Sequence, residues 1–139
     1  MVGVACAVAG AACKDDQADA RKAADRECAE ERTQSQEAME WLARDDTMGF
    51  ELTKSEMREL AQQLYDAGAR TVEVGYSALG DEDSGDTVEI GGLLVVVLPA
   101  AKPARQAVLA EAHRIDRLFY EDARPRRDLG QSCLLVALD

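Results

Sequence analysis

Residues 87–99, TVEIGGLLVVVLP, give the clearest strand signal in this chain. From residue 93 to residue 98 it is uninterrupted Leu and Val, a pattern typical of a strand that is buried on both faces of its sheet. Pro99 ends the strand because proline has no backbone N–H to donate to a neighbouring strand. We therefore expect this segment to be a central strand, with Val96 buried in the middle of it.

Strand and helix signals alternate on both sides of this strand. In chain order we expect a strand at 48–52, a helix at 53–68, strands at 71–77 and 87–98, a helix at 103–122 and a strand at 132–139. Thr53 and Glu56 form a capping box at the start of the first helix, and Gly68 is placed to end it. The order predicts an α+β fold of the ferredoxin-like split βαβ type (βαββαβ), a four-stranded antiparallel sheet with two helices on one face, preceded by an N-terminal helical segment.

The N-terminal third adds three segments to this picture. Residues 1–12 are an apolar, leader-like segment, residues 13–35 are a charged, Ala-rich helical tether, and residues 36–139 are a single α+β domain. Within that domain an apolar stripe predicts a helix at 36–45 that docks on the sheet. Because the central strand is apolar on both sides, either this helix or a second copy of the protein has to cover its second face. Glu73 is expected on the less buried face.

The first residues suggest where the protein is located. Residues 2–12, VGVACAVAGAA, carry no charged or polar side chain and have the length of the apolar region of a signal peptide. Cys13 follows, and the chain then turns polar at once. This arrangement resembles the N-terminus of a bacterial lipoprotein precursor. The resemblance implies that Ala11 and Ala12 precede a cleavage point, that Cys13 is lipidated, and that the protein is anchored at the cell envelope. Export without a lipid and a cytoplasmic location are the alternatives.

The sequence shows no recognisable catalytic or cofactor-binding motif. His113 is the only histidine and has no second histidine or cysteine at the spacing of a zinc site. No nucleophile elbow, P-loop or dinucleotide fingerprint is found, so we expect no enzyme activity and no cofactor. Asp81, Asp83 and Asp86 in the run DEDSGD are the candidate ligands for a hard cation. A solvated, Asp- and Gly-rich hairpin turn is the favoured interpretation of that run.

Two further groups of side chains bear on function. Arg124, Arg126 and Arg127 form a basic cluster in an acidic protein and are the candidate contact for an anion or a partner. The favoured alternative is that they pair with carboxylates of the same chain. Cys28 and Cys133 are the two thiols outside the leader. They are either bridged or, in the case of Cys133, buried as a small apolar side chain, and the sequence alone does not decide between these.

The overall charge restricts the class of partner. A formal net charge of −11 repels phosphate backbones, so nucleic-acid binding is disfavoured. The function we expect is a non-catalytic binding or interaction module at the cell envelope. Its partner would be a protein or a second copy meeting the apolar sheet face, and a lipid anchor would hold it at the membrane. The alternatives are a soluble cytoplasmic small-ligand sensor or enzyme of ferredoxin-like fold, and an acidic partner that neutralises a basic protein.

Overall fold

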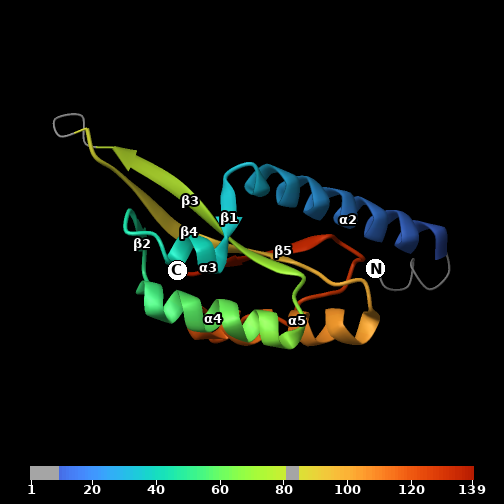
Figure 1. Ribbon diagram of the computed structural model, residues 1–139. Coiled ribbons are helices and arrows are strands. Elements are labelled where there is room, and N and C mark those ends of the chain that lie inside the picture. Colours follow the sequence, from blue (N-terminus) through green and yellow to red (C-terminus); the bar gives the residue numbers. More distant parts are fainter. Residues whose placement is uncertain (1–9, 81–84) are drawn as a thin grey trace.

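A five-stranded sheet runs through the middle of the fold and carries helices on both faces, as the computed structural model shows (Figure 1). The structure describes residues 10–80 and 85–139, with side chains from Asp16 onward. Its elements are α2 (Gly10–Arg32), β1 (Ser35–Glu37), α3 (Ala38–Leu42), β2 (Thr47–Gly49), α4 (Lys54–Ala67), β3 (Thr71–Gly80), β4 (Thr87–Val97), α5 (Lys102–Phe119) and β5 (Cys133–Ala137). The α+β class expected from the sequence is confirmed.

Strand β4 is the centre of the sheet. It pairs antiparallel with β3 along one edge, and β1 pairs antiparallel with the outer edge of β3. Its other edge is shared by two strands: β2 runs parallel to it at Ile90, and β5 runs antiparallel to it at Val96. Val96 is fully buried. The expectation that residues 87–98 form the central strand is therefore confirmed.

The number and placing of the strands differ from the expected four-stranded sheet. The fifth strand is β1, which lies where the sequence predicts a tether and a docking helix. The last strand, β5, pairs with β4 instead of lying beside the first strand of the domain. The reason is the shortness of β2, where a side chain at Gly49 would run into the carbonyl oxygen of Leu52 as the chain turns toward α4. That turn leaves the rest of the β4 edge to β5.

The larger core lies between the sheet and helices α3, α4 and α5. Trp41, Met57, Leu64 and Ile115 are among the side chains fully buried there. Helix α4 begins with the expected capping box at Thr53 and ends at a glycine in the left-handed conformation. The expected docking helix at 36–45 is divided into β1 and the short α3, and α3 packs into this larger core.

Helix α2 covers the second face of the sheet. The sequence instead predicts that a helix at 36–45 or a second copy of the protein covers it. In Figure 1 this helix lies across the sheet on the side opposite α4 and α5. Cys28 is only 2% exposed and packs with Val95 and Cys133 of the sheet. The predicted tether is thus a docked helix in its C-terminal half. No helix among the described residues is long and apolar enough to cross a membrane.

Candidate functional site

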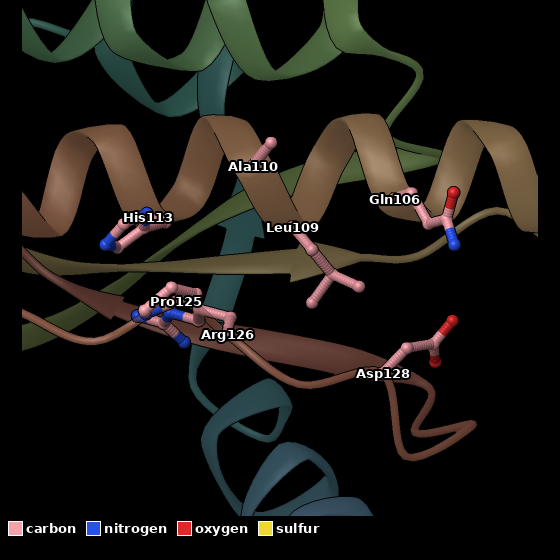
Figure 2. Close-up of a pocket in the computed structure, with 7 residues that line it drawn as sticks. All are labelled: Gln106, Leu109, Ala110, His113, Pro125, Arg126 and Asp128. Carbon is pink, nitrogen blue, oxygen red and sulfur yellow. The ribbon is translucent and has the colours of Figure 1, made fainter.

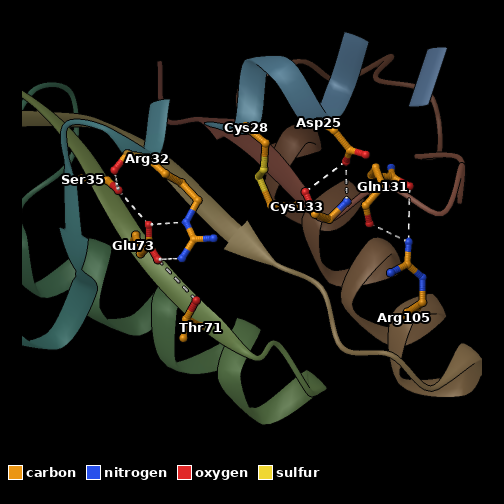
Figure 3. Close-up of a disulfide and its surroundings, with 10 residues drawn as sticks. Asp25, Cys28, Arg32, Ser35, Thr71, Glu73, Arg105, Gln131 and Cys133 are labelled. Atoms are coloured by element: carbon orange, nitrogen blue, oxygen red, sulfur yellow. Dashed lines mark hydrogen bonds and ion pairs between the residues drawn. A yellow bond between two sulfur atoms is a disulfide. The ribbon is translucent and has the colours of Figure 1, made fainter. Parts of the chain in front are cut away.

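A disulfide between Cys28 and Cys133 joins α2 to the first residue of β5 (Figure 3). The two Cα atoms lie 6.0 Å apart, a normal separation for a bridged pair, and the bond links positions 105 residues apart in the chain. Both cysteines are buried against Val95. The pairing that the sequence left open is therefore formed in the structure.

Polar contacts fix α2 on either side of the disulfide (Figure 3). Toward its N-terminus, the backbone N–H and the hydroxyl of Ser132 donate to Asp25 Oδ1 at 2.8 and 3.0 Å. Toward its C-terminus, Arg32 donates from Nε and Nη2 to the two carboxylate oxygens of Glu73 at 3.1 and 2.9 Å. Ser35 Oγ donates to the same carboxylate at 2.7 Å. Glu73 thus lies on the face beneath α2 and has partners there.

A cavity of about 310 Å³ lies between α5 and the loop that follows it (Figure 2). His113 and Arg126 stand at one end, Gln106 and Asp128 at the other, and Leu109 projects between them. His113 Nε2 lies 2.8 Å from the carbonyl oxygen of Ala123 and donates to it. The histidine therefore holds the loop against the helix.

Charged pairs close both ends of this cavity. Arg126 donates from Nε and Nη2 to the two carboxylate oxygens of Asp116, each at 2.7 Å. Arg105 donates to Asp128 at 2.8 Å from Nη2, and this hydrogen bond holds the pKa of the Asp128 carboxyl below its ordinary value. Because Arg126 and Asp128 are already paired, the cavity presents largely neutralised groups to a ligand.

The predicted basic cluster is divided by these contacts. Arg126 pairs inside the chain, as the favoured interpretation expects, although its partner is Asp116 of α5. Arg124 and Arg127 are exposed, and within the described part of the chain their guanidinium groups make no ion pair or hydrogen bond; Arg127 takes part only through its backbone carbonyl, which accepts from Gln131. The three arginines therefore do not converge on one anion site.

A polar cluster that the sequence did not indicate lies at the base of the β3–β4 hairpin. Arg44 donates to Gln36, Asp46 and Glu89 at 2.7–3.1 Å, and the indole N–H of Trp41 donates to Glu89 at 2.9 Å. The hydrogen bond from Arg44 lowers the pKa of Asp46. These residues come from four separate segments, so no spacing pattern in the sequence predicts the cluster.

The other predicted positions are less constrained by the structure. Asp81 and Asp83 lie outside the described residues, and Asp86 is exposed. Across residues 10–80 and 85–139, no group of three His, Cys, Asp or Glu side chains is placed to hold a metal ion. Cys13 lies in the first turns of α2.

Comparisons with models of known protein families, with curated proteins and with solved structures give no match to this chain.

Proposed function

We propose that this protein is a non-catalytic interaction module, held at a bacterial cell envelope by a lipid on Cys13. The observation that carries the proposal is the Cys28–Cys133 disulfide. Disulfides form and persist in oxidising compartments, whereas the bacterial cytoplasm keeps thiols reduced. A buried disulfide between distant segments therefore favours export over the cytoplasmic alternatives.

The position of Cys13 supports an anchor. Cys13 and Cys28 belong to the same helix, α2. At 1.5 Å per residue, the fifteen steps between them span about 22 Å. Because the disulfide fixes α2 to the sheet, a lipid at Cys13 would hold the domain at a set distance from the bilayer.

Exposed apolar side chains support the interaction role. Met48, Phe50 and Leu79 are each about half exposed or more. In Figure 1 the β2–α4 turn and the β3–β4 hairpin lie at the end away from the first turn of α2. Grouped apolar side chains on a surface are typical of sites that bind a partner.

The same proposal includes the finer assignment of the fold. We take residues 47–139 to be a variant of the ferredoxin-like arrangement. The parallel pairing of β2 with β4 and the antiparallel pairing of β3 with β4 support this assignment. The place of β5 beside β4 is the departure from that arrangement.

The test is fractionation of cells that express the protein from its own gene. We expect the wild type in the membrane fraction, with mass spectrometry finding an acylated N-terminus at Cys13. Cys13→Ser should move the protein to the soluble fraction. Cys6→Ser is the matched control, because residue 6 would be removed with the leader, and it should leave the distribution unchanged. A soluble wild-type chain that retains residues 1–12 would contradict the anchor.

A further inference from the structure

The β3–β4 hairpin carries an apolar face that is distinct from both cores. In register, Val88 lies opposite Leu79, and Ile90 lies opposite Met48 of β2. Residues directly opposite each other on paired strands point to the same side of the sheet. Phe50 lies just past the end of β2, where its backbone N–H still donates to the carbonyl oxygen of Gly91 in β4, so it continues the alternation and shares the side of Met48. We call these five residues, Met48, Phe50, Leu79, Val88 and Ile90, the arm face.

The arm face lies on the α2 side of the sheet but beyond α2. Glu73 marks that side, because Arg32 of α2 binds it. The ring of Tyr76 stacks with Trp41 in the opposite core, and Leu79 therefore returns to the side of Glu73. In Figure 1 α2 runs from β1 away from the hairpin, so no described element lies over this part of the sheet.

The arm face is exposed to a degree unusual for large apolar side chains. Met48 is 47% exposed, Leu79 is 57% exposed and Phe50 is 65% exposed, while Val88 and Ile90 are half-buried between them. Sequence patterning indicated that the apolar strand β4 needs a cover on this side. Helix α2 supplies it for Val95 and its neighbours and leaves the hairpin half without one.

The surroundings of the arm face are acidic. The segments 45–51, 77–80 and 85–91 contain five acidic residues and no Lys or Arg. These residues are Asp45, Asp46, Glu51, Asp86 and Glu89. Arg44 binds Asp46 and Glu89, and Asp45 and Glu51 are exposed at the border. The formal net charge of the whole chain is −11, so the long-range field around the arm face is also negative.

We propose that the arm face binds a protein partner that presents an apolar strip bordered by Lys and Arg. An apolar centre with a complementary charged rim is the usual anatomy of a protein interface. A second copy of this chain would bring another acidic border and the same net charge against it, and an anionic bilayer would be repelled in the same way. This inference rests on the proposed interaction function and adds the surface and the chemistry of the partner.

The experiment titrates the purified full chain with two synthetic helical peptides, one of Leu and Lys and one of Leu and Glu in the same pattern. We expect the Leu/Lys peptide to bind and the Leu/Glu peptide not to bind. The double variant Phe50→Ser with Leu79→Ser should weaken binding by about 10-fold or more. Leu118→Ser is the matched control, since Leu118 is 59% exposed but lies outside the arm face, and it should stay within about 2-fold. Raising the salt from about 0.05 M to about 0.5 M should also weaken binding.

Three results would overturn the proposal. Equal binding by the wild type and the double variant would place the contact elsewhere. A dimer seen by analytical ultracentrifugation and lost in the double variant would assign the arm face to a second copy. Sedimentation with phosphatidylglycerol vesicles that is lost in the same variant would assign it to a membrane. Melting curves check that the variants are folded. Because the titration uses purified protein, its failure is separate from failure of the Cys13 anchor.

Discussion

Glu73 joins helix α2 to the sheet through its carboxylate. Arg32, Ser35 and Thr71 all donate to it, and its side chain is 13% exposed. The sequence places Glu73 on the less buried face, where substitution by Ala should hardly change the stability of the protein. The partners of its carboxylate change that expectation. The alternation of TVEVGYS identifies the face but not the partners, because Arg32 is 41 residues away in sequence.

We expect Glu73→Ala to lower the free energy of unfolding by about 1–2 kcal/mol, since hydrogen bonds to a charged group are lost while solvent screens part of the ion pair. Chemical denaturation measures the change. Glu51→Ala is the control, because Glu51 is exposed, and it should stay within about 0.5 kcal/mol. An equally small effect at Glu73 would show that this contact does not stabilise the docked α2.

Tyr65 makes a second long-range contact, from α4 to Glu37 of β1. Its hydroxyl donates to Glu37 Oε2 at 2.6 Å. Burial, together with this hydrogen bond to a carboxylate, raises the pKa of Tyr65 from 10.0 to about 12. Because the unfolded chain loses this proton first, the contribution of Tyr65 to stability is complete below pH 10 and is lost as the pH rises from 10 to about 12.

We therefore expect the free energy of unfolding of the wild type to fall more steeply between pH 10 and about 12 than that of Tyr65→Phe. Denaturant titrations at several pH values measure both slopes. Tyr120→Phe, at an exposed position, should behave as the wild type does. Parallel slopes for the wild type and Tyr65→Phe would contradict the contact with Glu37.

At the scale of elements, local sequence patterns correctly predicted the helix ends and strands that are determined by residues close together in the chain. The capping box at Thr53 and the terminating Gly68 appear as expected, and the apolar run at 93–98 is buried at 94–96 and 98 and partly buried at 93 and 97. The docking of α2 was not predictable, because a single Cys28 among Ala and charged residues makes no apolar stripe. The place of β5 was not predictable either, since it depends on how early the chain turns at Gly49.

The disulfide gives the docked α2 a measurable contribution to stability. A bridge across a separation of 105 residues restricts the unfolded chain strongly. We expect Cys28→Ala and Cys133→Ala each to lower the free energy of unfolding by about 3–4 kcal/mol. Reduction of the wild type should have a similar effect, and limited proteolysis should then cut within α2 first. Equal stability with and without reductant, for a chain shown to be bridged beforehand, would show that the disulfide does not stabilise the docked α2.

At the scale of the whole molecule, α2 and the hairpin give the fold two different ends. The first turns of α2 carry Cys13, and the β3–β4 hairpin extends in the other direction (Figure 1). The apolar side chains of the arm face on this hairpin are exposed or half-buried. The sequence indicated the leader-like segment and an apolar sheet face in need of a cover. Which half of that face stays open depends on where α2 ends, and that is set by tertiary packing around Cys28.

The redox state of Cys28 and Cys133 in growing cells tests the envelope assignment most directly. Cells are quenched in acid, free thiols are alkylated before lysis, and the peptides that contain the two cysteines are identified by mass spectrometry without reduction. We expect a single disulfide-linked pair of peptides, with neither cysteine alkylated. Recovery of both cysteines as alkylated free thiols would place the protein in a reducing compartment and would contradict the proposed function.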